Sequence, residues 1–130
     1  MYAEDIIANY EHPHNKGKLD NPSISMHNYN PLCGDEITMY LKIDNGKIAD
    51  VKFEGTGCAI SMATASMLTD FVKSKSLNEI EQMGVKSVFD LIGFDPGPAR
   101  LKCATLSLRA LKEATFAYEH KKADAETQNL

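Results

Sequence analysis

The stretch EITMYLKIDNGKIADVKFE, residues 36–54, decides the fold of this chain. Two strand-like segments, 36–43 and 47–54, lie on either side of the triplet Asp44-Asn45-Gly46. Because Asn and Gly tolerate the positive φ that tight hairpin turns require, the triplet predicts a turn between two antiparallel strands. A third strand-like segment, 23–30, precedes this pair. We therefore expect a small antiparallel sheet.

Helical patterns lie on both sides of these strands. The N-terminal residues predict a short helix that ends before Pro13, and a turn-rich loop follows over 12–22. After Cys58, apolar residues recur at steps of three and four and predict one face of an amphipathic helix that ends near Lys75. The members of this stripe are Ile60, Ala63, Met67, Leu68 and Phe71.

The second half of the chain predicts two further helices. The segment 76–79, SLNE, fits a capping box that starts a helix, and Gly84 fits its C-terminal stop. A short apolar turn over 88–92 leads into a loop over 93–98 that is dense in Gly and Pro. The last helix is expected over 99–120. Its apolar stripe contains Leu101, Ala104, Leu108, Leu111, Thr115 and Tyr118.

The order of strands followed by helices indicates an α+β domain, in which a three-stranded antiparallel sheet packs against helices on one face. The 130 residues and 43% hydrophobic content are enough for one compact core. No internal repeat divides the chain. We expect a single domain over 1–120 and a polar, flexible tail over 121–130.

Composition excludes several classes of function. The net charge of -4 comes from 18 acidic and 14 basic residues that are mixed along the chain, which argues against a nucleic-acid-binding surface. The chain has no apolar run of the roughly 18 residues that a membrane helix needs, and its first residues are acidic, unlike a secretory signal. Three cysteines are an odd number, which favours free thiols in a reducing compartment. We expect a soluble, cytoplasmic protein with no membrane partner.

The three cysteines each stand in a short motif of their own. Cys33 and Asp35 lie two residues apart at the start of a predicted strand, where an extended backbone points both side chains to the same side. Cys58 follows a predicted strand and precedes a helix, and Cys103 lies in the first turns of the last helix. The positive helix N-termini are expected to favour Cys58 and Cys103 as thiolates.

The neighbours of these cysteines suit a bound metal or cluster. Gly34 and Gly57 remove side-chain bulk next to sulfur, while Arg100 and Lys102 place positive charge beside Cys103. Three thiolates and the Asp35 carboxylate make four ligands, a number that suits tetrahedral zinc or a 2Fe-2S cluster. An oxygen ligand binds iron less tightly than a thiolate does, so these four ligands suit a cluster that is later released. Spacing alone leaves open that the cysteines are buried without chemistry.

The motifs themselves resemble a known family. The segments IANYEHPHNKG (7–17), NPLCGD (30–35), GCAIS (57–61) and RLKCATL (100–106) resemble the IscU/SufU/NifU-N family of iron-sulfur cluster assembly scaffolds. The similarity runs over nearly the whole chain. It implies a three-stranded antiparallel sheet packed with helices, and a scaffold rather than an enzyme, on which a transient 2Fe-2S cluster is built, with possible sulfur-acceptor activity.

The resemblance also implies roles for particular residues and partners. Cys33, Asp35, Cys58 and Cys103 become the metal ligands, with Asp35 as the fourth ligand or as the residue that keeps the cluster labile. Gly34, Gly57, Arg100 and Lys102 surround them. A cysteine desulfurase would deliver persulfide sulfur, with Cys33 and Cys103 as candidate acceptors. Iron-sulfur acceptor or carrier proteins would receive the cluster, and the family resemblance allows an oligomer with the cluster bound.

Two departures from the family patterns bear on the choice between this function and a second one. The IscU branch carries a His where this chain has Lys102. A protonated Lys is a poor metal ligand, and Lys102 could instead pair with Asp35 in the empty site. The spacing between Cys58 and Cys103 is too short for the insertion typical of the SufU branch. The alternative is a zinc-dependent sulfurtransferase that accepts persulfide from a desulfurase, with zinc in the same site. The missing insertion argues against this alternative, and the segment KCAT (102–105) argues for it. A structural zinc module without sulfur chemistry is a third class.

Overall fold

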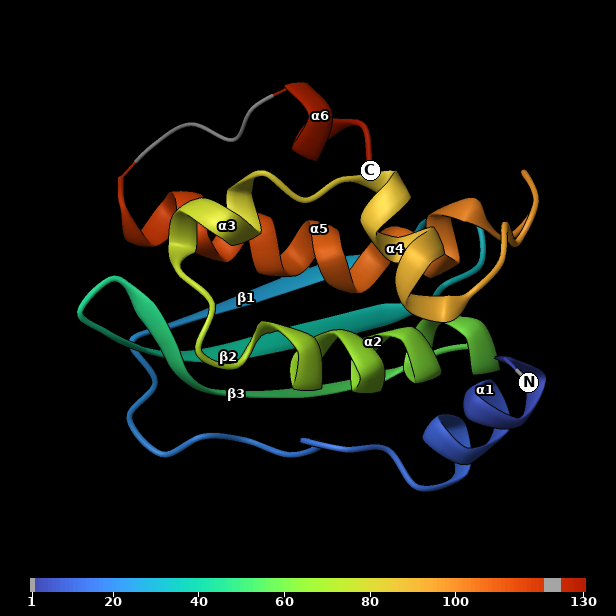
Figure 1. The fold of residues 1–130 in the computed structure, drawn as a ribbon, viewed down its shortest axis with the longest axis horizontal. Coiled ribbons are helices and arrows are strands. Elements are labelled where there is room, and N and C mark those ends of the chain that lie inside the picture. The colour runs from blue at the N-terminus through green and yellow to red at the C-terminus, as the bar shows by residue number, and fades with distance from the viewer. Residues whose placement is uncertain (1, 121–124) are drawn as a thin grey trace.

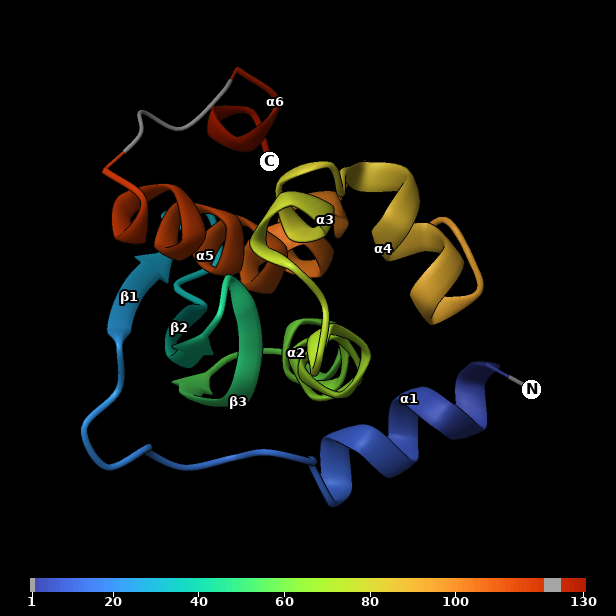
Figure 2. The ribbon, with the colours of Figure 1, turned by 60° about the vertical axis from the view of Figure 1, so that its left-hand side comes forward.

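The computed structural model describes residues 2–120 and 125–130. Three strands form one antiparallel sheet in the order β1-β2-β3, and helices lie on one face of it (Figures 1 and 2). The predicted α+β class and the three-stranded sheet are therefore confirmed. In chain order the elements are α1 (Tyr2–Glu11), β1 (Ile24–Tyr29), β2 (Glu36–Asp44), β3 (Lys47–Thr56), α2 (Ala59–Val72), α3 (Leu77–Glu81), α4 (Val85–Ile92), α5 (Leu101–Tyr118) and α6 (Ala125–Gln128).

The β2–β3 hairpin forms at the predicted turn. Asn45 and Gly46 have φ values of 53° and 72°, which is the left-handed geometry that a tight hairpin turn requires. The two strands pair over their whole length, from the turn to the pair between Glu36 and Thr56. This register places the start of β2 beside the end of β3, and so fixes which loops meet at that end of the sheet.

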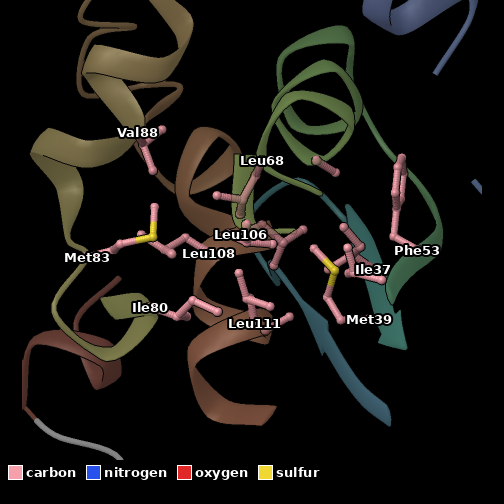
Figure 3. Packing of buried hydrophobic residues seen from close by; sticks show 14 of the residues in the cluster. Ile37, Met39, Phe53, Leu68, Ile80, Met83, Val88, Leu106, Leu108 and Leu111 are labelled. Atoms are coloured by element: carbon pink, nitrogen blue, oxygen red, sulfur yellow. The ribbon is translucent and has the colours of Figure 1, made fainter. Parts of the chain in front are cut away.

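The core lies between the sheet and the two longest helices. Alternate residues of β2 and β3 are buried, and α2 and α5 pack against the same face of the sheet and against each other (Figure 2). Figure 3 shows Ile37 and Met39 of β2 on the side of α5 where Leu106 lies, and Leu108 on the other side of that helix, beside Met83. The largest fully buried apolar side chains are Phe53, Ile37, Met39, Leu41, Ile48, Leu68, Ile80, Ile92, Leu108, Leu111 and Val51.

The helix α2 is buried on more sides than its sequence stripe predicts. It contacts α1, α4, α5 and β3, and all residues from Ser61 to Ser66 are buried. Phe71, which the stripe assigns to the buried face, is instead 48% exposed. The cause is tertiary, because a helix surrounded by neighbours has no single apolar face.

The region between α2 and α5 differs from the prediction in two places. The capping box is confirmed: Ser76 Oγ accepts a hydrogen bond from the Glu79 backbone, and Glu79 Oε1 accepts one from the Ser76 backbone. However, α3 ends at Glu81 with Gln82 as its C-cap, and Gly84 is the N-cap of α4 rather than the stop of α3. The predicted apolar turn over 88–92 is the second half of α4, which Gly93 ends in the left-handed conformation with φ of 88°.

Both ends of the chain lie against the domain. The loop after α1 bridges to β3, since the Gly17 backbone donates to the Phe53 carbonyl and the Phe53 backbone donates to the Asn15 carbonyl. At the other end, where a flexible tail is expected, α6 packs on α5, and Thr127 and Leu130 are buried (Figure 1). Residues 121–124, which belong to the same expected tail, lie outside the described residues.

Candidate metal centre

The sheet register brings three distant segments of the chain together. Asp35 immediately precedes β2, and Cys58 follows β3 by two residues as the N-cap of α2. Because Glu36 pairs with Thr56, the β1–β2 loop and the β3–α2 junction are neighbours. Cys103 joins them from the first turn of α5, which packs against β1 and β2. All three cysteines are free thiols at this end of the sheet.

Three of the four predicted ligands form a tight group. One ligand atom from each of Cys33, Asp35 and Cys103 lies within 4.8 Å of the others. The Sγ atoms of Cys33 and Cys103 are 3.4 Å apart. Cys58 borders this group, because it interacts with the Asp35 carboxyl and with the Cys103 thiol. The structure therefore brings all four predicted donors to one place.

Asp35 is a buried carboxylate, with only 5% of its surface exposed. Burial alone would raise its pKa. Hydrogen bonds from the Ser61 hydroxyl, the Cys58 backbone and the Cys103 and Cys58 thiols outweigh burial and hold the pKa of Asp35 below its usual value. The carboxyl group is thus kept ionised at neutral pH, as a metal ligand must be.

Cys103 contradicts the expectation that a helix N-terminus favours its thiolate. Burial raises the pKa of the Cys103 thiol far above its usual range, and the Cys33 hydrogen bond, the charge of Cys58 and the Asp35 carboxyl raise it further. In the metal-free site this sulfur therefore keeps its proton at neutral pH. Cys33, by contrast, is exposed at the mouth of the site, and Cys58 is half-buried. The three sulfurs differ in accessibility, which the sequence does not reveal.

The glycines near the site serve different purposes. A Cβ atom at Gly57 would lie 2.4 Å from Ser61 Oγ and 2.9 Å from Asp35 Cγ, so this position has no room for a side chain. Gly34 has open space around it, but its φ of 78° is the left-handed region that favours glycine. The expectation of close approach applies to Gly57, while Gly34 shapes the turn between Cys33 and Asp35.

Of the two predicted neighbouring cations, Lys102 is engaged by the C-terminal segment. The Lys102 amine donates to the carbonyl oxygens of Asn129 and Leu130, at 2.7 and 3.0 Å. The suggested pairing of Lys102 with Asp35 is therefore not what the structure shows, because the C-terminal segment engages the amine instead. Arg100 is exposed at the N-cap of α5. The side chains of residues 102 and 103 leave α5 in different directions, since adjacent residues do not share a helix face.

Two residues that the sequence analysis did not select line the site. Ser61, in the first turn of α2, donates to Asp35 Oδ2 at 2.9 Å. The Asn30 amide donates toward Cys103 Sγ at 4.0 Å, and its own oxygen accepts from the Leu32 backbone at 3.1 Å. The signal for Ser61 was its spacing of three residues from Cys58 at a helix start, which puts both on one side of the first turn.

The donor set fits a soft or borderline metal. Cys33, Cys58 and Cys103 supply three sulfurs and Asp35 supplies one oxygen, which suits tetrahedral zinc or the irons of a 2Fe-2S cluster. Binding would require Cys103 to lose its proton, which a nearby cation favours. His14, whose imidazole is also a ligand type for zinc, instead contacts α2, with its Nδ1 2.5 Å from Asp70 Oδ2. Within the described residues, no helix is long and apolar enough to cross a membrane.

Comparisons with known proteins find relatives over most of the chain. The family model described as NifU-like N terminal domain matches residues 1–125. The zinc-dependent sulfurtransferase SufU of Bacillus subtilis is 42% identical, over 92% of each chain. The iron-sulfur cluster assembly scaffold protein IscU of Thermotoga maritima is 36% identical, over 88% of this chain and 92% of that protein.

Solved structures share the fold. A candidate iron-sulfur cluster assembly scaffold for the SUF system from Fervidobacterium islandicum superposes with a TM-score of 0.77 at 28% identity, covering 86% of this chain and 94% of that one. The N-terminal part of a NifU-like protein from Brucella abortus gives a TM-score of 0.76, covering 94% and 100%. At 20% identity, the second comparison shows the fold alone.

Proposed function

Because this chain belongs to the NifU-like N-terminal domain family, we propose that it is a scaffold for assembling a transient 2Fe-2S cluster. Iron and desulfurase-derived sulfur would be its substrates, and acceptor proteins would receive the cluster. The observation that carries the proposal is the convergence of Cys33, Asp35 and Cys103 within 4.8 Å, with Cys58 alongside. Three unpaired thiols also suit a reducing, cytoplasmic setting.

The accessibility of the sulfurs favours Cys33 over Cys103 as the persulfide acceptor. Cys33 is exposed, whereas Cys103 is buried and its raised pKa keeps it a thiol. The thiolate of Cys33 would attack the terminal sulfur of the donor persulfide, forming a new S–S bond. The donor's S–S bond breaks, and the donor cysteine leaves as a thiolate. The step needs no further oxidant or reductant.

Asp35 gives the site its capacity for release. A carboxylate oxygen is a harder donor than sulfur and holds iron-sulfur iron less tightly. Three thiolates and one carboxylate also concentrate about four negative charges, of which a cluster core offsets roughly half. The buried, ionised Asp35 therefore supplies a ligand that completes the site without making it permanent.

A zinc-dependent sulfurtransferase is the second candidate function. The 42% identity to Bacillus subtilis SufU, over 92% of both chains, favours it. The same four donors would hold zinc. When bound, zinc would keep the three cysteine sulfurs ionised. Cys33, as the exposed sulfur, would accept and pass on the persulfide sulfur in this function as well.

One anaerobic experiment separates the two functions. The metal-free protein is incubated with a cysteine desulfurase, cysteine and dithiothreitol, which reduces persulfide sulfur to sulfide, with either ferrous iron or zinc. Absorption spectra are recorded with iron and acid-labile sulfide analysis. A scaffold gives a visible-absorbing species with equal iron and sulfide in the iron sample. A colourless iron sample, together with desulfurase activation by the zinc-loaded protein alone, would contradict the scaffold and support the sulfurtransferase.

A further inference from the structure

Ser61 makes the best-defined polar contact to the donor group. Its hydroxyl donates to Asp35 Oδ2 at 2.9 Å, and only 2% of the residue is exposed. Asp35 lies just before β2, whereas Ser61 lies in the first turn of α2, so the contact joins two elements across the site. A hydrogen bond between a hydroxyl and a buried carboxylate is of the stronger, charge-assisted kind.

The surroundings of Ser61 limit what its hydroxyl is able to do. Ser61 Oγ lies 3.1 Å from the Cys58 carbonyl oxygen and 3.7 Å from Cys58 Sγ. A hydroxyl has one proton, so donation to Asp35 competes with donation to that carbonyl. The missing side chain of Gly57 leaves the space in which Ser61 and Asp35 meet. The contact between Ser61 and Asp35 is therefore buried in the local structure, in the space that Gly57 leaves open.

We propose that Ser61 is a positioning residue that holds Asp35 in its ligand orientation and so sets the affinity of the site for metal. The inference rests on the proposed function, because it assumes that Asp35 is a ligand. A carboxylate has two oxygens. The one that accepts from Ser61 is fixed, which leaves the other directed to the bound ion. Without the hydroxyl, the buried carboxylate loses this anchor and must be ordered when the metal binds.

The test measures Zn²⁺ affinity by competition with a chromophoric chelator, and records the visible absorption of the Co²⁺-substituted protein. Loss of a residue that orients a ligand typically weakens metal binding by about 10- to 100-fold. We expect Ser61→Ala to weaken Zn²⁺ binding in this range and to change the Co²⁺ d–d bands, which report ligand geometry. Circular dichroism verifies that each variant keeps the helical content of the unsubstituted protein.

Thr64→Val is the matched control. Thr64 is also fully buried on α2, but its hydroxyl donates to the Ile60 carbonyl of the same helix, at 2.6 Å. It removes one buried hydroxyl without touching Asp35. We expect this variant to keep the unsubstituted affinity and Co²⁺ spectrum, so a general effect of losing a hydroxyl from α2 is distinguished from loss of the contact.

An Asp35→Ala background separates positioning from structure. If Ser61 acts through Asp35, adding Ser61→Ala to Asp35→Ala changes Zn²⁺ affinity by less than about twofold. An unchanged affinity in Ser61→Ala alone would overturn the inference, and so would the same loss in both backgrounds. Failure of the unsubstituted protein to bind Zn²⁺ or Co²⁺ would overturn the proposed metal site itself, which is a separate outcome.

Discussion

Gly57→Ala adds one methyl group where the site has no room for it. The new Cβ would lie 2.4 Å from Ser61 Oγ and 2.9 Å from Asp35 Cγ, whereas ordinary contacts begin near 3.4 Å. Gly57 does not have a left-handed φ, so the effect is steric. One of the two side chains must move by roughly 1 Å, which separates the hydrogen-bonded pair. Overpacking of this kind costs about 1–3 kcal/mol of folding free energy.

Metal binding should weaken in this variant as well as stability. Zn²⁺ affinity is measured by chelator competition, and the free energy of unfolding is measured in urea. We expect an affinity loss of about tenfold or more, as for other changes that displace a ligand's hydrogen-bond partner. Gly97→Ala is the control, since nothing lies within 4 Å of its Cβ position and its φ of 83° makes Ala strained. That variant should lose about 1–2 kcal/mol of stability and keep its affinity. Unsubstituted affinity in Gly57→Ala would refute the reasoning.

Two other perturbations test the site and its surroundings. The raised pKa of Cys103 means that the metal-free folded protein binds the proton of this thiol more tightly than the unfolded chain does. The protonated thiol therefore contributes stability that is fully present below the usual thiol pKa of 9.0 and is lost as the pH rises above that value. In urea, the free energy of unfolding of the metal-free protein should fall by up to about 1.4 kcal/mol per pH unit above that value. A fall of equal size in Cys103→Ala would contradict the assignment of this pH dependence to Cys103. Lys102→Met removes the donor to the Asn129 and Leu130 carbonyls, so hydrogen exchange over 125–130 should become faster. Arg100→Met should leave that exchange unchanged, and equal rates in both variants would count against the anchoring role of Lys102.

Local chemistry explains which parts of the fold the sequence predicts. The turn at Asn45-Gly46 and the capping box at Ser76 depend on residues within a few positions of one another, and both are confirmed. Gly84 is different, because a glycine suits either end of a helix and only the packing of α4 decides its role. Phe71 follows the helical period but lies on the exposed side, since the neighbours of α2 leave that position uncovered.

The site follows the same division. The cysteine motifs and the Cys33–Asp35 spacing are visible in the sequence, but their convergence depends on the β2–β3 register and on the packing of α5. The protonated state of Cys103 follows from burial beside other donors, which no local pattern encodes. Lys102 is adjacent to Cys103 in sequence and yet binds the C-terminal segment, because consecutive helix residues point in different directions.

The lifetime of the assembled cluster in Asp35→Ala tests the central claim, that three sulfurs and one oxygen form a site for temporary holding. Clusters are reconstituted on the unsubstituted protein, on Asp35→Ala and on Asp90→Ala, an exposed control of equal charge change. Their transfer to an apo-ferredoxin is followed by absorption under anaerobic conditions. Removing the buried carboxylate reduces the negative charge around the cluster, so we predict slower transfer from Asp35→Ala alone. Transfer from Asp35→Ala at the unsubstituted rate or faster would contradict the claim.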